Sequence, residues 1–371
     1  MTEPEPLQQI DRTCVLFRQR KLAYFSGCDY FRLASHPRVL AALLAGVKKF
    51  GLNVAASRMT TGNHALYREL EAELADFFAA ESALLVSTGY VTNLVVAQAL
   101  AGNFSHALID DGSHPSLSDA ARLLDCPVLQ FKSRNVAALA VAVQRCGPQS
   151  KLLVLTDGMF SHDGSAAPLV EYLEVLPKDA LLLVDDAHGA GILGRTGKGT
   201  LEHAGVSRRR IIQTATLSKA FGAYGGAILG TARLRQRILD RSRIFVGSTP
   251  LPLPLAHAAL AGVRILKANA GLRRRLLGNV AHVKTSLREA GLPLAETPGP
   301  IVLLLPRRAS EATRLQRALL AARIYPPFIK YPGGPPHGYF RFAISSEHSR
   351  PQLDALLKVL HRYATAQAAS D

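Results

Sequence analysis

Seven short apolar runs, separated by stretches with helical or polar character, are the feature of this sequence that most constrains its fold. They cover residues 83–86, 107–109, 128–131, 152–155, 181–184, 211–214 and 227–229. Apolar residues with helical spacing occur before and between them, at 36–50, 64–80, 91–101, 115–125, 135–146 and 169–176. Strands that alternate with helices form a mostly parallel sheet with helices on both faces. The sequence therefore predicts an α/β fold whose large domain contains a mostly parallel seven-stranded sheet.

A second, smaller region is predicted after residue 250. The stretch Pro250-Leu251-Pro252-Leu253-Pro254 favours a boundary because proline interrupts regular structure. Beyond it, helical patterns at 255–270, 272–290, 309–322 and 351–365 accompany two strand-like runs at 301–305 and 339–345. We expect an N-terminal segment (1–50), a large domain (51–250) and a small C-terminal α+β domain (251–371).

The composition narrows the class of protein. Of the 371 residues, 48% are hydrophobic and 19% are charged, which predicts a packed core rather than disorder. No apolar run approaches the ~20 residues that a membrane-spanning helix needs, and the N-terminus lacks the layout of a signal peptide. The four cysteines have no short spacing typical of a zinc site or a disulfide framework. We therefore expect no metal, no membrane association and a cytoplasmic location.

The formal net charge of +16 has three interpretations, of which the first is a nucleic-acid partner and the second is a solvated basic surface. The arginines are spread along the chain, with the densest runs at 208–210 and 273–275, and no known nucleic-acid-binding motif accompanies them. This distribution favours a solvated basic surface and no nucleic-acid partner. The third interpretation is an acidic protein or a polyanionic substrate.

Polar side chains follow two of the apolar runs. Asp185, Asp186 and His188 come directly after the run 181–184, and Lys219 follows the run 211–214. In an open α/β sheet, ligands bind at the carboxyl ends of the strands. Lys219 is set among small and apolar residues, and partial burial lowers a lysine pKa and frees the amine as a nucleophile. An acid, an imidazole and such a lysine suit pyridoxal phosphate (PLP), whose aldehyde the lysine would carry and whose pyridine nitrogen the acid would keep protonated.

A dinucleotide site is the main alternative for this region. The segment Gly189-Ala190-Gly191-Ile192-Leu193-Gly194 matches the GxGxxG pattern after a strand. That pattern requires a helix to follow directly, whereas residues 195–199 continue as a loop. The phosphate-loop pattern also fails, because Gly199 follows Lys198 where Ser or Thr is required. We therefore interpret the segment as a loop.

Four further residues have both a functional and an ordinary interpretation. Gly89 and Tyr90 begin a predicted helix whose first N–H groups suit a phosphate, although a plain strand–helix turn has the same pattern. His114 could stack on a ligand ring or simply cap a helix and face solvent. Arg341, within an apolar strand pattern, would face the carboxylate of a substrate or of a structural ion pair.

Together these residues resemble the α-oxoamine synthases, PLP enzymes of the aspartate-aminotransferase fold (fold type I). The resemblance extends from about residue 25 to 364. Four motifs support it: Ser57-Arg58-Met59-Thr60-Thr61-Gly62-Asn63-His64-Ala65-Leu66-Tyr67-Arg68-Glu69-Leu70-Glu71, Asp185-Asp186-Ala187-His188-Gly189, Thr216-Leu217-Ser218-Lys219-Ala220-Phe221-Gly222 and Arg341-Phe342-x-x-Ser345-x-x-His348.

The resemblance implies a homodimeric acyltransferase that condenses a small amino acid with an acyl thioester and releases carbon dioxide. It is greatest to the members that join L-alanine to a pimeloyl thioester, carried by coenzyme A or by an acyl carrier protein. Their product is 8-amino-7-oxononanoate, an intermediate of biotin biosynthesis. The alternatives are another α-oxoamine synthase with a different acyl donor or amino acid, and an aminotransferase.

The resemblance also implies a role for each site residue. Lys219 would be the Schiff-base lysine, Asp185 would pair with the pyridine nitrogen, and His188 with the ring hydroxyl. His114 would stack over the ring. Further cofactor contacts would come from Gly89, Tyr90, Ser161 and Thr216, and from Ser248 and Thr249 of the partner subunit. On the substrate side, Arg341 would hold the amino-acid carboxylate, and Asn53 and Arg58 would also be substrate-binding residues.

This chain departs from the family pattern on the acyl side. Asn53-Val54-Ala55-Ala56-Ser57-Arg58 stands where the family has Gly-Ser-Gly-Gly-Ser-Arg, which adds side chains to the substrate channel. Asp157 stands where Glu is common, and the loop 332–336 lacks the family's substrate-binding Thr. We also expect the family's N-terminal extension, with its substrate-contacting arginine, to be missing. None of these changes alters the PLP set.

Overall fold

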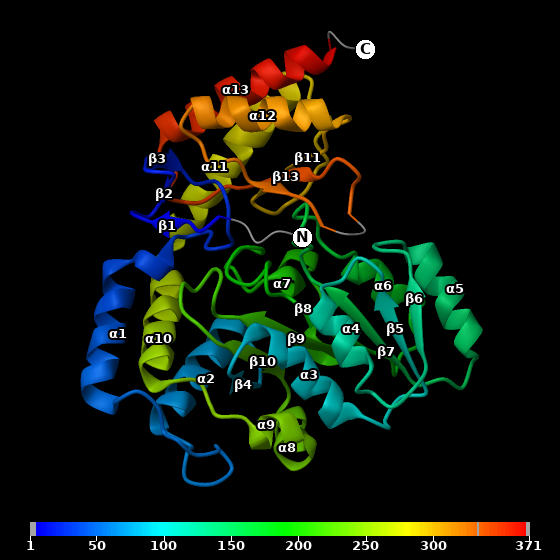
Figure 1. Ribbon diagram of the computed structural model, residues 1–371. Coiled ribbons are helices and arrows are strands. Elements are labelled where there is room, and N and C mark those ends of the chain that lie inside the picture. The colour runs from blue at the N-terminus through cyan, green and yellow to red at the C-terminus, as the bar shows by residue number, and fades with distance from the viewer. Residues whose placement is uncertain (1–4, 332–333, 369–371) are drawn as a thin grey trace. The chain divides into compact units, whose positions relative to one another are not determined.

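The computed structural model describes residues 5–331 and 334–368, so part of the substrate loop 332–336 lies outside the described residues. The chain divides into two compact units (Figure 1). The large unit comprises Pro37–Ser161 and Ser165–Ala270. The small unit comprises the described parts of Met1–His36, His162–Gly164 and Gly271–Asp371.

A seven-stranded sheet forms the centre of the large unit. Its order is β4 (Ser82–Val86), β10 (Gly226–Gly230), β9 (Ile211–Thr216), β8 (Leu181–Asp185), β7 (Leu152–Asp157), β5 (His106–Asp110) and β6 (Val128–Phe131). β10 runs antiparallel to β4 and to β9, and the other described strand pairs of this sheet are parallel. The predicted sheet is confirmed, with each strand at the expected apolar run. Its carboxyl ends bring residues from β7, β8 and β9 side by side, because Asp157 pairs with Asp185 and Asp185 with Thr214.

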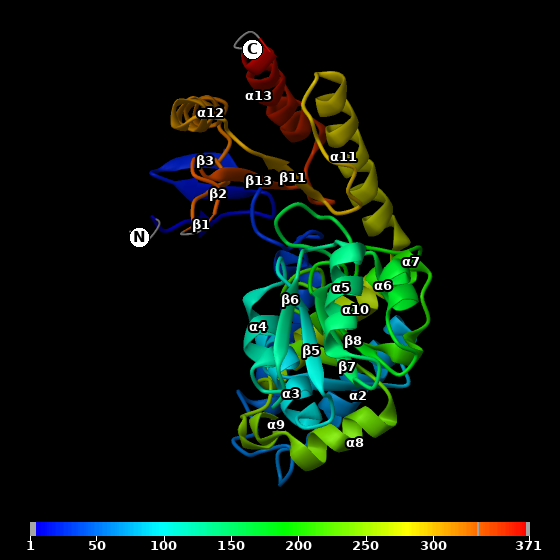
Figure 2. The ribbon, with the colours of Figure 1, turned by 90° about the vertical axis from the view of Figure 1, so that its right-hand side faces the viewer.

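Helices cover both faces of this sheet, which explains why its strands are apolar throughout. On one face, α3 (Gly89–Leu100), α4 (Pro115–Ala121) and α8 (Ala232–Arg241) pack on alternate strand residues such as Leu183. On the other face, α5 (Val136–Cys146), α6 (Leu169–Val175) and α7 (Thr200–Ala204) pack on Leu182 and Val184. Figure 2 shows the strands between these two groups of helices. The period of two along β8 therefore divides the core into two layers.

The large unit extends beyond the expected limits of 51 and 250. It includes α1 (Pro37–Phe50), α2 (Ala65–Phe78), α9 (Arg243–Gly247) and α10 (Leu253–Ala268). Gly46 of α1 lies so close to α10 that an added Cβ would be 2.8 Å from the Pro254 Cα, and His257 Nδ1 lies 2.8 Å from the Ala42 carbonyl oxygen. The proline-rich stretch begins α10 instead of separating two domains, because proline is well tolerated in the first helical turn.

The small unit combines the N-terminal and C-terminal parts of the chain. One antiparallel sheet contains β1 (Gln8–Gln9), β2 (Cys14–Phe17) and β3 (Arg20–Ala23), and a second has the order β11 (Ile301–Leu304), β13 (Tyr339–Ala343) and β12 (Phe328–Ile329). Its helices are α11 (Ala270–Glu289), α12 (Ala309–Ala321) and α13 (Arg350–Ala368). The N-terminal segment joins this unit through backbone hydrogen bonds from Ala23 to Arg323 and from Ala343 to Phe25, each 2.8 Å. Throughout the described chain, no helix combines the length and apolar character needed to cross a membrane.

Candidate active site

Lys219 and His188 meet beyond the carboxyl ends of β9 and β8. The Lys219 Nζ lies 2.8 Å from the His188 Nε2, although the two residues are far apart in sequence. His188 is buried and Lys219 is half-buried. A partly shielded amine next to an imidazole is an arrangement suited to a nucleophile with a proton acceptor at hand. The structure thus brings together the polar side chains that follow these two strands.

Asp185, the last residue of β8, is buried and held by a network that the sequence analysis did not anticipate. Asn93 Nδ2 donates to the Asp185 Oδ2 at 2.6 Å, and the Ala187 N–H donates to its Oδ1 at 3.0 Å. The Asn93 Oδ1 in turn accepts from the Thr214 hydroxyl at 2.8 Å, which fixes the orientation of the amide. Asn93 is fully buried in α3, where its neighbours Leu94, Val95 and Val96 are apolar. An amide among these apolar neighbours was the available signal for this positioning residue.

A second carboxyl group, Asp157 on β7, lies next to Asp185 in the sheet register. Its Oδ1 accepts a hydrogen bond from the backbone N–H of His114 at 3.1 Å. Burial and the neighbouring Asp185 raise the pKa of Asp157 well above its usual value. Asp157 therefore keeps its proton more readily than an ordinary aspartate.

Asp186 has a structural role, which separates it from Asp185. Its Oδ1 accepts from the Thr200 hydroxyl at 2.6 Å, and its Oδ2 accepts from the Thr200 N–H at 2.8 Å and from the Gln213 Nε2 at 2.6 Å. The glycines of the GxGxxG-like loop make room for it: a Cβ at Gly189 would lie 2.1 Å from the Asp186 Oδ1, and one at Gly199 would lie 1.9 Å from its Oδ2. The glycine-rich loop therefore wraps a buried carboxylate, and no helix follows it before α7.

We expect Asp186→Asn to destabilise the fold by about 1–3 kcal/mol, because an amide nitrogen cannot accept the bonds that one carboxylate oxygen now accepts. The measurement is the free energy of unfolding from a urea titration. Thr200→Val, which removes one of the three bonds, should cost less. If Asp186→Asn were fully stable and yet inactive, Asp186 rather than Asp185 would be the reactive acid.

A cradle suited to a phosphate lies at the start of α3. The Thr88 side chain caps this helix by accepting from the Val91 N–H at 3.3 Å. Gly89 packs directly on Thr216, because an added Cβ would lie 2.7 Å from both the Thr216 Cβ and its Oγ1. The Thr216 hydroxyl lies 2.8 Å from that of Ser218. Hydroxyl groups beside a helix N-terminus favour an anion.

His114 and Tyr90 lie together beside this region. Their rings are 5.9 Å apart in an edge-to-face arrangement, and the Tyr90 hydroxyl donates to Asp119. His114 caps α4, because its Nδ1 accepts from the Ser116 N–H at 3.2 Å. This nitrogen therefore has the helix-capping role that was the alternative to ligand binding. Burial lowers the pKa of His114. The charge of Asp185 partly opposes this shift, and the charge of Lys219 adds to it. The ring is therefore neutral near pH 7, and it lies close enough to Asp185 and Lys219 for both charges to affect its pKa.

Three other predicted cofactor contacts have defined places in the large unit. Ser161 lies in the loop after β7 and is half-buried. Ser248 and Thr249 follow α9 and, together with Arg58, line a small cavity of about 20 Å³. The Ser248 hydroxyl donates to the Ile244 carbonyl oxygen. Their roles toward a cofactor stay predictions.

The predicted substrate residues have other partners in this structure. Arg58 is buried in an ion pair with Glu71 (2.5 Å) and donates to the Asn63 side chain at 3.0 Å. The Asn53 side chain accepts from the Ala55 N–H at 2.7 Å. Arg341 is buried in β13 of the small unit and donates to the Tyr30 hydroxyl at 3.3 Å. A structural role thus suffices to explain Arg58, and substrate binding by all three stays a prediction.

The large-unit set fits the chemical needs of PLP. It offers a half-buried amine, a buried carboxylate whose two oxygens are already oriented, and a polar cradle in which a Cβ at Gly89 would not fit. The carboxylate ends β8, and the amine follows the end of the neighbouring parallel strand β9, so the two groups lie at the same edge of the sheet. These are the groups that an aldehyde, a pyridine nitrogen and a phosphate require.

Comparisons with known proteins agree with this geometry. The model of the aminotransferase class I and II family matches residues 28–360. The 8-amino-7-oxononanoate synthase of Thioalkalivibrio sulfidiphilus is 39% identical over 346 residues, which is 92% of this chain and 88% of that protein. That of Hahella chejuensis is 35% identical over 95% of this chain and 89% of its own length.

Solved structures give a similar result. A serine palmitoyltransferase of Sphingomonas wittichii has a TM-score of 0.92 at 27% identity, over 99% of this chain and 94% of that one. Another serine palmitoyltransferase, solved with PLP, has a TM-score of 0.90 at 27% identity over 97% and 91%. The 8-amino-7-oxononanoate synthase of Francisella tularensis shares the fold, with a TM-score of 0.80 at 24% identity over 94% and 99%.

This chain belongs to the aminotransferase class I and II family. Within it, the resemblance to the α-oxoamine synthases and the expected fold type I architecture are confirmed.

Proposed function

We propose that this enzyme catalyses the decarboxylative condensation of L-alanine with a pimeloyl thioester, which yields 8-amino-7-oxononanoate for biotin biosynthesis. PLP is its cofactor, and acyl transfer is its reaction class. The observation that carries the proposal is the constellation of Lys219, His188 and Asp185 at adjoining strand ends, in a chain 39% identical to a named 8-amino-7-oxononanoate synthase.

Each of the site residues in the large unit would contribute a distinct step or contact. When bound, PLP supplies an electron-withdrawing ring that stabilises negative charge at the α-carbon of an amino acid. Lys219 would hold the cofactor and then move protons at the α-carbon through its Nζ, with His188 fixing that amine. Asp185 would hold the pyridine nitrogen protonated, with Asn93 keeping the carboxylate in place. The cradle of Gly89, Thr216 and Ser218 would bind the phosphate.

The amino acid is the first point to test. Serine is the rival to alanine, because serine palmitoyltransferases are structural neighbours with TM-scores of 0.90 and 0.92. The experiment incubates the PLP-loaded protein with alanine, glycine or serine in D₂O and follows loss of each α-proton by NMR. We expect the fastest exchange with L-alanine. Preferred exchange of serine would assign the chain to the rival reaction, and no exchange with any of them would contradict an α-oxoamine synthase.

A homodimer is part of the proposal. Three apolar residues form an exposed stripe on α1, Leu40, Leu44 and Val47, with exposed fractions of 42%, 63% and 50%. They lie at helical spacing on the face opposite α10, and the exposed apolar residues Leu52 and Met59 follow in the next loop. A contiguous apolar surface of this kind is typical of an interface between protein chains.

We expect the two subunits to share their active sites, with Ser248 and Thr249 serving the partner's phosphate. Lys219→Ala subunits mixed with Ser248→Ala/Thr249→Ala subunits should regain activity, because each hybrid dimer contains one intact site. Random mixing predicts about a quarter of the wild-type rate. The measurement is turnover after joint refolding, and each variant alone is the control. An impaired double variant that gives no complementation would count against a shared site.

The thioester carrier is the remaining part of the proposal. We expect an acyl carrier protein to be preferred over coenzyme A, because such carriers are acidic and this chain has a net charge of +16. Opposite charges raise encounter rates by ~10–1000-fold at low salt. The kcat/KM for the protein donor should therefore fall more steeply with salt than that for the coenzyme A donor. If kcat/KM fell equally with salt for the two donors, charge would not determine the choice of carrier.

The arginine runs 208–210 and 273–275 are poor places for charge reversal in that test. Arg210 donates to the carbonyl oxygens of Pro177 and Leu173 at 2.7 Å each, and Arg208 donates to the Phe78 carbonyl at 2.9 Å. Arg275 pairs with Glu347 at 2.9 Å. These side chains hold local structure, so reversing a whole run would disturb the fold as well as the surface charge.

A further inference from the structure

A cavity of about 310 Å³ opens at the end of the sheet opposite Lys219. Its apolar floor includes Leu181 and Ile211, the first residues of β8 and β9, whereas Asp185 and Thr216 are the last residues of the same strands. At ~3.3 Å per residue, the two ends of a strand of this length are on the order of 13–17 Å apart. The cavity is therefore separate from the candidate active site.

Four arginines surround this floor: Arg208, Arg209, Arg233 and Arg237. Arg208 comes from the turn before β9 and Arg237 from α8, so distant parts of the chain bring the cations together. Among the described residues, no carboxylate lines the cavity and none of these four arginines forms a side-chain ion pair. We call this group the distal arginine cluster.

The cations of the distal arginine cluster are incompletely compensated. Arg208 uses its Nη2 on the Phe78 carbonyl and the Gln213 side chain, but its buried Nη1 has no hydrogen-bond partner among the residues described. Asp186 is the acid whose charge favours ionised Arg208, and its oxygens are already engaged by Thr200 and Gln213. A buried guanidinium nitrogen without an acceptor is costly, which makes an added anion favourable.

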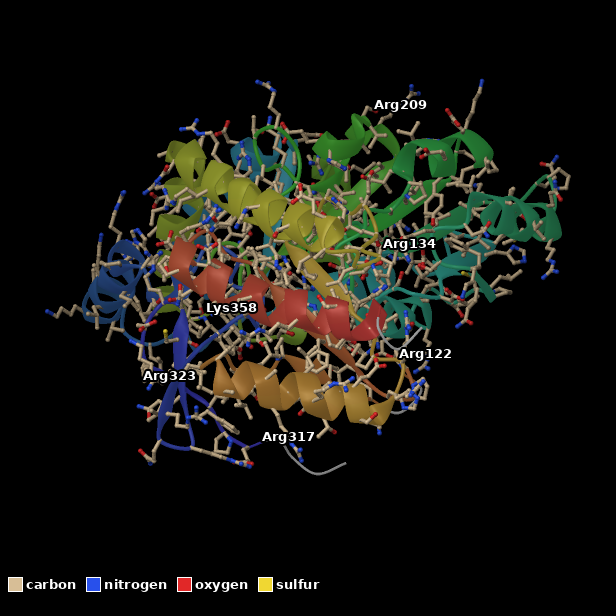
Figure 3. All side chains as sticks on the ribbon, turned by 90° about the horizontal axis from the view of Figure 1, so that it is seen from above. Arg122, Arg134, Arg209, Arg317, Arg323 and Lys358 are labelled. Carbon is tan, nitrogen blue, oxygen red and sulfur yellow. The ribbon has the colours of Figure 1, made fainter. Side chains whose placement is uncertain are left out.

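Arg237 adds a second cation that lacks a counter-charge. It donates to the Ala99 carbonyl oxygen at 2.9 Å and to the Asn103 side chain, both neutral acceptors. Burial lowers the pKa of Arg237, and the nearby cations Arg241 and Arg233 lower it further. Arg209 and Arg233 are exposed, and Figure 3 shows Arg209 extending outward from the ribbon. Neither makes a side-chain hydrogen bond in the described part of the chain, so both are available to a ligand.

We propose that this cavity is a second binding site, specific for a small amphipathic anion with a phosphate or carboxylate head group and a hydrocarbon body. The arginines match the head group, because guanidinium groups bind these oxyanions through paired hydrogen bonds. The floor of Leu100, Phe104, Leu181, Ile211, Ile212 and Leu234 matches the hydrocarbon body. The volume lies at the lower end of the ~300–1,000 Å³ typical of small-molecule sites.

The test is calorimetric titration of the PLP-loaded protein with four probes: octyl phosphate, octanoate, inorganic phosphate and octanol. Octyl phosphate or octanoate should bind at least about tenfold more tightly than both inorganic phosphate and octanol. Inorganic phosphate lacks the hydrocarbon body, and octanol lacks the anionic head group. The stronger of the two amphiphiles identifies the head group. Equal affinity for octyl phosphate and inorganic phosphate, or no binding by either amphiphile, would overturn the proposal.

Charge reversal then locates the site. Arg209→Glu/Arg233→Glu changes two exposed cavity arginines and should weaken the preferred amphiphile at least about tenfold. The matched control, Arg314→Glu/Arg317→Glu, makes the same change in net charge on exposed positions of α12 in the small unit and should bind as the wild type does. If the cavity variant binds as tightly as the wild type, or if both variants weaken equally, the ligand does not occupy this cavity.

Discussion

Lys219→Ala should abolish covalent attachment of PLP and lower turnover by at least about 10³-fold, while leaving the protein folded. Its amine lies 2.8 Å from the His188 Nε2 and is half-buried, so its removal breaks no core packing. Alanine cannot bond to the aldehyde, and it cannot carry protons at the α-carbon. The measurement is borohydride reduction followed by peptide mass spectrometry, together with turnover and the melting temperature.

Two controls make this result specific. Lys219→Arg keeps the positive charge beside His188 but should also fail to attach PLP, because a guanidinium remains protonated. Lys198→Ala removes a lysine from the loop after β8 and should retain the attachment. Reduced PLP found on a lysine other than Lys219 in the wild-type protein would contradict the assignment.

Asp185→Asn should lower turnover by about 10²–10³-fold and still allow PLP to bind. The amide oxygen can accept only one of the two hydrogen bonds that Asn93 Nδ2 (2.6 Å) and the Ala187 N–H (3.0 Å) now donate to the two carboxylate oxygens, and the amide NH₂ group is a donor toward the pyridine nitrogen. A donor at that position stabilises the unprotonated ring, which is a weaker electron sink. The measurements are kcat and the PLP dissociation constant.

Asp185→Glu separates charge from geometry. It retains the carboxylate and should recover more activity than Asp185→Asn, although Asn93 no longer meets it at the same position. Asp157 is the only described neighbouring carboxyl in register with Asp185, and removal of the Asp185 charge makes Asp157 easier to ionise. A rate near that of the wild type for Asp185→Asn would show that another carboxylate serves the ring nitrogen.

The sheet could be predicted from sequence because its strands are buried on both faces. Runs such as 152–155 and 181–184 are apolar without interruption, and they form most of β7 and β8, respectively, as expected. The same physics placed the polar groups, since a side chain directly after a buried strand must emerge at the edge of the sheet. Lys219 and His188 were expected at strand ends from this argument, and the Lys219 Nζ lies 2.8 Å from the His188 Nε2.

Other features depend on tertiary contacts that have no local pattern. The choice between Asp185 and Asp186 depends on partners at Asn93 and Thr200, which lie far along the chain or across a loop. The expected boundary at residue 50 missed the packing of α1 on α10, because an amphipathic helix does not reveal its partner. Arginine runs look like a single basic surface in sequence, yet Arg210 is tied to backbone carbonyls while its neighbour Arg209 lies at a cavity.

The central claim is tested most directly by one reaction, in which the PLP-loaded enzyme receives L-alanine labelled with ¹³C in its carboxyl group and pimeloyl-coenzyme A. Mass spectrometry then follows three species: labelled carbon dioxide, 8-amino-7-oxononanoate and pyruvate. We expect labelled carbon dioxide and unlabelled 8-amino-7-oxononanoate in equal amounts, and we expect both to be lost in Lys219→Ala. Labelled pyruvate without labelled carbon dioxide would contradict the proposed condensation and identify an aminotransferase.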